Sequence, residues 1–321
     1  MQLANILNKA TPLPLGAGRG LRFAPGALYA ATAVFSALLV ALLCGAPSAS
    51  ALERLPVFVS IAPQKYFVER IGADRVTVSV MVAPGANPAT YEPRPRQMVA
   101  LGSARIYFAV GAPFESAWLS KIVAANPSMK VIHTDAGIEK IAMAAHTGDE
   151  GHGEAGHAPG GLDPHVWLSP PLVKTQAAHI LDALVAADTA GAAVYRANYL
   201  AFARDLDSLN VDLKQVFQGK TGGEFMVFHP SWGYFARAYG LRQVPVEIEG
   251  KNPKPAQLQA LITHARERGI QVVFVQPQFS KRSAEIIAKA IGGKVVVADP
   301  LAEDWLTNIR RQAEAIAAAL R

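Results

Sequence analysis

Two histidines and one aspartate, far apart along the chain, have types and surroundings that suit metal chemistry. His165 follows a histidine-bearing loop, whereas His229 and Asp299 each follow a short apolar run that we interpret as a strand. Ligands of parallel α/β sheets bind beyond the carboxyl ends of strands, so these positions favour a common site. Two imidazoles with one carboxylate suit zinc, manganese or iron far better than calcium. The sequence therefore predicts a transition-metal site formed by these three side chains.

Cysteine usage limits which atoms can bind the metal. The only cysteine, Cys44, lies in an apolar leader. Leu43 precedes it, where a lipid-attachment site would have a small residue, so we do not expect a lipid anchor. The mature chain then contains no thiol and no disulfide, and its metal ligands must be nitrogen and oxygen atoms.

The N-terminal leader has the features of an export signal. Three basic residues precede the apolar run 27–43, and the small-residue sequence Ala-Ser-Ala follows at 49–51. This order predicts a signal peptide over residues 1–51, cleaved near Ala51, and a periplasmic protein. The alternative is a retained membrane anchor, because the apolar run is near the lower limit for a span.

Strands and helices alternate on both sides of a long helical stretch. Residues 171–218 are mostly helix-forming, with apolar residues at helical spacing, and suit a connecting spine. Apolar, β-rich runs predict strands at 55–62, 75–82, 105–110, 129–133, 224–228, 243–248, 271–275 and 294–298. Helical segments separate these strands, and this rhythm predicts mainly parallel sheets covered by helices.

The predicted fold is an α/β protein with two lobes joined by a long spine helix. The 321 residues, of which 51% are hydrophobic, are enough for two modest cores. We expect an N-terminal lobe over residues 52–170, the spine helix over 171–218 and a C-terminal lobe over 219–321. The net charge of +6 with no Lys/Arg-rich run does not indicate a nucleic-acid partner.

Residues 144–162 form a segment of different composition inside the first lobe. They include His146, His152 and His157 with several glycines and acids, and they lack apolar periodicity. We interpret them as a mobile surface loop. Two readings stay open, a solvated linker with incidental histidines or a weak metal collector that feeds the main site. The collector reading favours zinc over manganese.

Several segments resemble the ZnuA/TroA-like family, the metal-binding solute-binding proteins of ABC importers. The two most specific are GLDPHVWLSP at 161–170 and VFHPSWGYFARAYGL at 227–241. Further matches, in the same order along the chain, are SIAPQKYFVERIGADRV at 60–76, GANPATYEPRPRQM at 85–98, EGKNPKPAQL at 249–258 and VVVADPL at 295–301. Together they extend over essentially all of the chain after the leader.

The resemblance implies a function and a ligand set. It implies a metal in the cleft between two lobes, with His165, His229 and Asp299 as ligands, and a long, rather rigid helix between the lobes. Such a protein is not an enzyme. It captures a divalent ion, here zinc with manganese as the alternative, and delivers it to a membrane permease. We expect a monomer.

The chain departs from the family at one ligand position. The family has a histidine where this sequence has Ala89, and a methyl group cannot coordinate a metal. Zinc usually takes four ligands, so one donor is missing. A water, Glu92 or a loop histidine such as His152 or His157 are the candidates for the fourth position.

Nearby residues have supporting roles in this interpretation. Asp163, Glu247 and Glu249 are candidate hydrogen-bond partners that orient an imidazole, with surface charge or capping as the alternative. Trp167, Trp232 and Tyr234 flank the predicted ligands, and we expect them to pack at the lobe interface.

Two other classes of function fit the sequence less well. Two histidines and an aspartate can activate water in a metal hydrolase, but the chain has no H-E-x-x-H motif and no nucleophile elbow. A cleft large enough for an organic substrate would favour that class. The second class is attachment to host tissue, to which relatives of this fold have been linked. It stays a minor alternative, because no segment of the sequence indicates a protein-binding surface.

Overall fold

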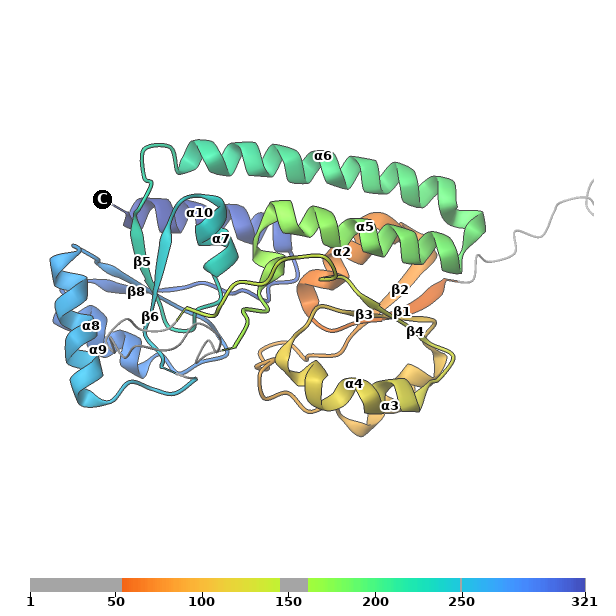
Figure 1. Cartoon of the computed structure of the whole chain (residues 1–321), viewed down its shortest axis with the longest axis horizontal. Coiled ribbons are helices and arrows are strands. Elements are labelled where there is room, and N and C mark those ends of the chain that lie inside the picture. Colours follow the sequence, from red (N-terminus) through yellow and green to blue (C-terminus); the bar gives the residue numbers. More distant parts are fainter. Residues whose placement is uncertain (1–53, 145–160, 249, 321) are drawn as a thin grey trace, which may run out of the picture. The chain divides into compact units, whose positions relative to one another are not determined.

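The computed structural model describes residues 54–144, 161–248 and 250–320. Within this part of the chain, two four-stranded sheets have all neighbouring strands parallel (Figure 1). Both sheets have the same order, β2-β1-β3-β4 in the first and β6-β5-β7-β8 in the second. The strands are β1 (Leu55–Val59), β2 (Val76–Val80), β3 (Ile106–Ala109), β4 (Lys130–His133), β5 (Glu224–Val227), β6 (Arg242–Pro245), β7 (Val272–Val275) and β8 (Lys294–Val297). The predicted α/β class and parallel sheets are confirmed.

Helices connect the parallel strands of each lobe. Proline stands in the first turn of several of them, where its missing N–H has no partner in a helix anyway. The first lobe contains α2 (Ala62–Gly72), α3 (Pro95–Ala100) and α4 (Pro113–Ala125). The second contains α7 (Gly233–Ala238), α8 (Pro255–Glu267), α9 (Arg282–Ala290) and α10 (Trp305–Ala319).

The predicted spine over 171–218 is two helices rather than one. α5 (Pro170–Ala187) and α6 (Ala192–Val216) pack against each other and are separated by a short 3-10 turn, Thr189–Gly191. Asp188 ends α5, and its side chain accepts a hydrogen bond from Gly191 N, so the chain reverses at this point. The single-helix prediction for this range is corrected accordingly.

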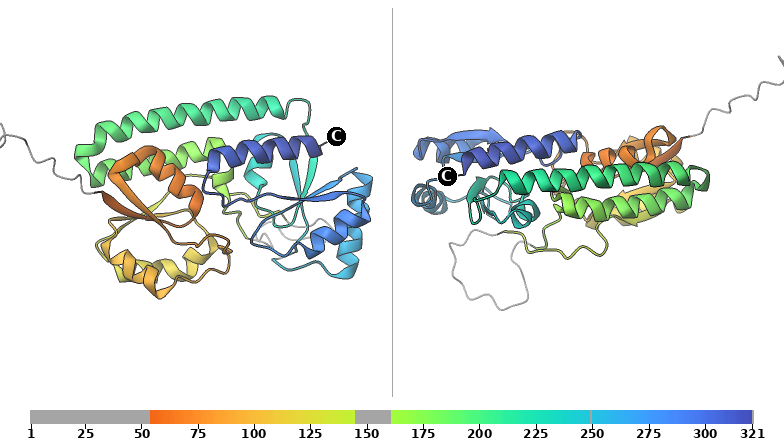
Figure 2. Two further views of the ribbon diagram at one scale, coloured as in Figure 1. Left: turned by 180° about the vertical axis from the view of Figure 1, so that it is seen from behind. Right: turned by 90° about the horizontal axis from the view of Figure 1, so that it is seen from above.

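Of the two spine helices, α6 is the one that packs on both lobes. It packs on α2 and α5 of the first lobe and on α10 of the second. Figure 1 shows it running along both sheets, and Figure 2 shows α10 beside it. The long connecting helix that the sequence predicts is therefore present, over a shorter range.

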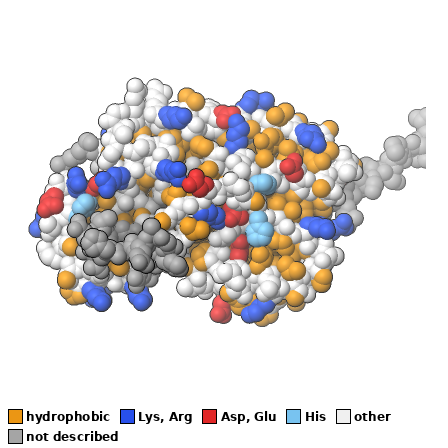
Figure 3. Space-filling model, viewed as in Figure 1, with side chains coloured by type: hydrophobic (Ala, Val, Ile, Leu, Met, Phe, Trp, Pro, Cys, Tyr) orange, Lys and Arg blue, Asp and Glu red, His pale blue; other side chains and the backbone are white. Residues whose placement is uncertain are grey.

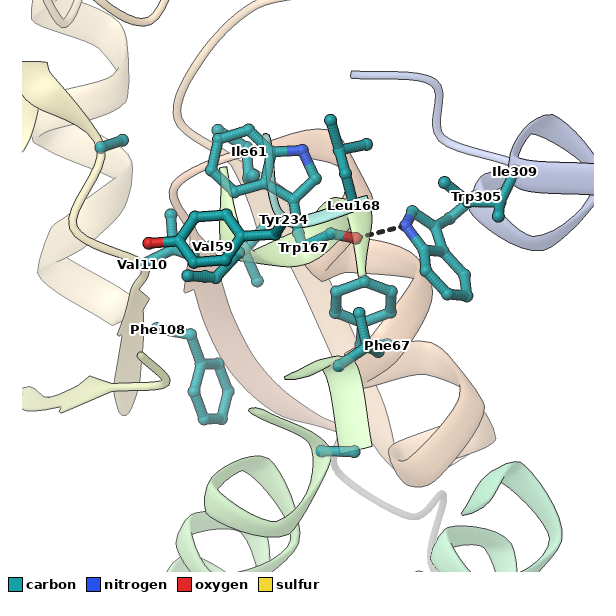
Figure 4. Close-up of a cluster of buried hydrophobic side chains, with 14 of the residues drawn as sticks. Val59, Ile61, Phe67, Phe108, Val110, Trp167, Leu168, Tyr234, Trp305 and Ile309 are labelled. Atoms are coloured by element: carbon teal, nitrogen blue, oxygen red, sulfur yellow. Dashed lines mark hydrogen bonds between the residues drawn. The ribbon is translucent and has the colours of Figure 1, made fainter. Parts of the chain in front are cut away.

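One hydrophobic core continues from the first lobe into the second. Phe67 and Trp167 belong to the same buried cluster as Trp305 and Ile309 of α10 (Figure 4). Phe67 and Trp305 are in edge-to-face contact, with ring centroids 5.2 Å apart. A second buried cluster, with Met226, lies within the C-terminal lobe. The cluster also includes Trp167, two residues after His165, and Ala298, directly before Asp299, so it anchors both segments.

The leader falls outside the described residues, so the predicted signal peptide and its cleavage near Ala51 remain predictions. Among the residues that the structure describes, every helix is too short or too polar to cross a membrane. On the face seen in Figure 3, basic and acidic side chains are interspersed.

Candidate metal centre

His165 and His229 lie side by side although they come from different segments. Their ring centroids are 5.1 Å apart, with the rings at 73°. His229 follows β5 after one residue, as predicted for a strand end. His165 lies instead just before the 3-10 turn Val166–Leu168 that leads into α5. The structure therefore brings two of the three predicted ligands together.

Asp163 orients the imidazole of His165. Asp163 Oδ1 is 2.7 Å from His165 Nδ1 and also accepts a hydrogen bond from the His165 backbone N–H at 2.8 Å. A carboxylate only accepts hydrogen bonds, so Nδ1 bears the proton and Nε2 has a free lone pair. Burial lowers the pKa of His165, although Asp163 acts in the opposite direction. A neutral imidazole is the form that binds a metal.

The Asp163 carboxylate is held in a confined, buried space. Its Oδ2 is buried and has no hydrogen-bond partner in the described residues. A β-carbon placed on Gly233 would lie 2.6 Å from this oxygen, so a glycine is required there. Tyr234, the next residue, donates a hydrogen bond to the carbonyl oxygen of Asp163 at 2.8 Å. The second lobe thus holds the carboxylate that orients His165.

His229 has a matching partner. Glu247 Oε1 is 2.6 Å from His229 Nδ1, so this imidazole also has its Nε2 free. Gln276 fixes the backbone of His229, since its amide accepts from His229 N and donates to His229 O. Phe279 stacks on the imidazole with ring centroids 4.9 Å apart. Of the three acids predicted to orient an imidazole, Asp163 and Glu247 do so, and Glu249 lies outside the described residues.

Both imidazoles line one small pocket of about 90 Å³. Ala89 lines the same pocket, so the position where the family has its first histidine does face the pair. The other lining residues are Asn87, Pro88, Pro113, Met143, Pro164, Trp167, Gln278, Phe279, Pro300 and Leu301. The pocket has room for an ion and a few waters, and it is much smaller than the usual cavity for an organic ligand.

Asp299 lies beside this pocket rather than in it. It follows β8 after one residue and lines a neighbouring pocket of about 160 Å³. Its Oδ1 accepts hydrogen bonds from Gln278 Nε2 at 3.2 Å and from Leu301 N at 2.9 Å. Among the residues that the structure describes, no three His, Cys, Asp or Glu side chains are close enough together to hold an ion. The third predicted ligand is therefore adjacent to the imidazole pair and separate from it.

The structure places only one of the side chains predicted as a fourth metal ligand. Glu92 is exposed and lines neither of the two pockets. His146, His152 and His157 lie outside the described residues, so the structure places none of them. Glu92 is thus in a poor position for a donor, and the loop histidines remain predictions.

Two tryptophans connect the segments of the predicted ligands. Trp167 donates from its indole N–H to the carbonyl oxygen of Pro300. Trp305 donates from its indole N–H to the carbonyl oxygen of Trp167, as Figure 4 shows. Trp167, Trp232 and Tyr234 are all buried, in agreement with the predicted packing role. These contacts bind the His165 segment to the Asp299 segment.

The sequence interpretation did not include the glutamines and the phenylalanine near the site. Gln276, Gln278 and Phe279 follow β7 directly, at the same sheet edge as His229 and Asp299. The rule that places ligands beyond strand ends would have indicated this segment. Met143, which lines the imidazole pocket, carries no comparable signal.

The chain is similar to known zinc-uptake proteins over most of its length. The family model described as "Zinc-uptake complex component A periplasmic" matches residues 57–319. The high-affinity zinc uptake system protein ZnuA of Bacillus subtilis is 29% identical over 259 residues, which is 78% of this chain and 79% of the relative.

Solved structures match over nearly their whole length. A crystal structure of ZnuA is 43% identical, with a TM-score of 0.77, over 83% of this chain and 99% of that one. A ZnuA variant lacking residues 138–173, solved with zinc bound, is 43% identical, with a TM-score of 0.75, over 83% and 98% of the two chains. The chain belongs to the ZnuA family, the periplasmic solute-binding components of zinc-uptake complexes.

Proposed function

We propose that this protein captures one zinc ion between His165 and His229 and delivers it to the permease of an ABC importer. The observation that carries the proposal is the pair of imidazoles with ring centroids 5.1 Å apart. Each imidazole has a carboxylate on Nδ1 and a free Nε2. Asp299 is the third ligand of the proposed site.

The donor set and the relatives support zinc as the cargo. Imidazole nitrogen and carboxylate oxygen suit Zn²⁺, and manganese is the alternative that the same donors accept. The hydrogen bonds to Asp163 and Glu247 fix the imidazoles before the ion arrives, which limits the entropy lost on binding.

The size of the site supports an ion rather than an organic substrate. The two pockets, as lined by the described residues, are about 90 and 160 Å³. A metal hydrolase would need space beside the ion for its substrate, and organic ligands usually occupy about 300–1,000 Å³. We therefore assign a binding and delivery role and no enzymatic reaction.

The proposed site of action is the periplasm. The family is periplasmic, and export of this chain would use the predicted signal peptide over residues 1–51. The protein acts as a monomer in this proposal, since one chain contains both imidazoles and the aspartate. The proposed partner is the membrane permease that withdraws the ion.

Metal titration of the mature protein tests this function. We expect one tight zinc site per chain and a rise in the unfolding temperature with zinc. At free zinc of about 100 times Kd, the stabilisation is about 2.7 kcal/mol. His165→Ala and His229→Ala should each remove the tight site while the metal-free variants unfold cooperatively. A mature protein that binds neither zinc nor manganese specifically would overturn the proposal.

A further inference from the structure

Gln278 lies between the imidazole pair and Asp299. It lines the pocket that contains His165 and His229, and it also lines the neighbouring pocket that contains Asp299. Its Nε2 donates a hydrogen bond to Asp299 Oδ1 at 3.2 Å. One side chain therefore borders both parts of the proposed site.

The amide oxygen of Gln278 is buried and has no hydrogen-bond partner among the described residues. A carboxylate accepts and does not donate, so the amide nitrogen must face Asp299 and the oxygen must face away from it. Buried polar atoms are usually paired, and an unpaired acceptor requires an explanation such as an ion. The oxygen of Gln278 therefore has a free lone pair that could bind a metal ion, in a side chain that borders both pockets.

The site has a matching deficit of donors. Ala89 faces the imidazole pair and has no donor atom. Zinc commonly takes four ligands, and two imidazoles with Asp299 supply three. Within the described ranges no third His, Cys, Asp or Glu lies close enough to the pair to form a site with it, and Asp299 borders the neighbouring pocket.

We infer that Gln278 Oε1 is the fourth metal ligand, in place of the imidazole that Ala89 cannot supply. This inference rests on the proposed function of the same site. The hydrogen bond to Asp299 keeps the two side chains together in the wall that the two pockets share. Two nitrogens with two oxygens form a harder set than three imidazoles with one oxygen, and the set therefore accepts manganese more readily.

Substitution of Gln278 tests the inference. Gln278→Leu keeps the size of the side chain and removes the donor, and we expect zinc affinity to fall by about tenfold or more. Gln278→Glu restores an oxygen and should stay within a few-fold of the parent. Gln218→Leu is the matched control, because Gln218 is exposed and lies after α6, away from both pockets. Thermal unfolding of each metal-free variant monitors folding.

Two measurements distinguish a metal ligand from a residue that only positions Asp299. They are the absorption spectrum of bound Co²⁺ and the effect of the substitution in an Asp299→Ala protein. Loss of a ligand should change the visible spectrum of bound Co²⁺ in Gln278→Leu but not in Gln218→Leu. If Gln278 acted only by orienting Asp299, Gln278→Leu would have no effect in an Asp299→Ala protein, whereas we expect a further loss of about tenfold. Unchanged affinity and spectrum in Gln278→Leu would refute the inference. That result, with binding still abolished in His165→Ala, would leave the proposed function intact.

Discussion

The indole N–H of Trp167 donates a 2.8 Å hydrogen bond to the carbonyl oxygen of Pro300. Trp167 lies two residues after His165, and Pro300 is the next residue after Asp299. One hydrogen bond thus connects the segments of two proposed ligands that lie in neighbouring pockets. This contact is therefore placed to hold the two segments together.

Replacing Trp167 with phenylalanine should weaken zinc binding by about fivefold, which corresponds to roughly 1 kcal/mol for one neutral hydrogen bond. Phenylalanine keeps an aromatic side chain but is smaller than the indole, so the lost N–H and a small cavity at this buried position both contribute. Calorimetric titration with zinc measures it. Trp118→Phe is the control, because Trp118 lies on α4 and lines neither pocket. Equal affinities in parent and Trp167→Phe would show that the contact does not position the site.

Removing the carboxylate that orients an imidazole should lower zinc affinity more than the Trp167 substitution does. We expect Glu247→Gln to lower zinc affinity by about 10- to 100-fold, because the charge that fixes the His229 tautomer is lost. The chain offers a matched control in Glu224, which is 2.9 Å from His264 Nε2 outside both pockets. Competition with a zinc-binding dye compares the two variants. An equal fall in affinity in Glu224→Gln would contradict a specific role for Glu247.

Histidine at position 89 should strengthen the site. Ala89 lines the imidazole pocket, so Ala89→His adds a nitrogen donor facing His165 and His229. We expect tighter zinc binding by about tenfold and a larger preference for zinc over manganese. Thr90→His controls for an added imidazole, since Thr90 is exposed and lines neither pocket. If Ala89→His and Thr90→His bound zinc alike, the fourth position would lie elsewhere.

Asp188 should make stability depend on pH at the turn between α5 and α6. The hydrogen bond from Tyr195, followed by those from Arg75, lowers the pKa of Asp188 below its ordinary value of 3.8. The native state therefore favours the ionised form. This contribution is fully present above pH 3.8 and is lost as pH falls through the lower native pKa.

Asp188→Asn should therefore be less stable than the parent at pH 7, by about 1–3 kcal/mol, because the buried Tyr195 hydroxyl loses a charged acceptor. The difference between parent and variant should shrink below about pH 4. Urea unfolding at several pH values measures it. Asp182→Asn, at an exposed position on α5, should behave as the parent. A difference that stayed constant from pH 7 to pH 3 would be evidence against this account.

Local patterns were sufficient to predict the strands and most helices. Runs such as Val272–Val275 are apolar on both faces, as buried parallel strands are, and helices such as α8 have a proline in the first turn, which is a start signal in the sequence. The break in the spine was missed because helix-forming residues continue on both sides of it. Asp188 and Gly191 were the available signals, a side-chain acceptor and a residue without a β-carbon.

The site could be predicted only in part. The family motifs and the strand-end rule predicted His165, His229 and Asp299, and the structure brings the first two together. The position of Asp299 beside the pair depends on contacts with Gln278 and Leu301, which are far from the histidines in sequence. Gln278 is uncharged and belongs to no recognised motif, so its place next to Asp299 could be seen only in the folded structure.

Helix α6 packs on both lobes and contains neither glycine nor proline. Hinge motions need a few residues that absorb a large change in backbone dihedrals, and an uninterrupted helix of 25 residues offers none. Within the proposed role, the importer must then loosen the ion by displacing the short segments around His165, His229 and Asp299 themselves. Recognition of the loaded form would accordingly depend on local differences in these surface segments, rather than on the angle between the lobes.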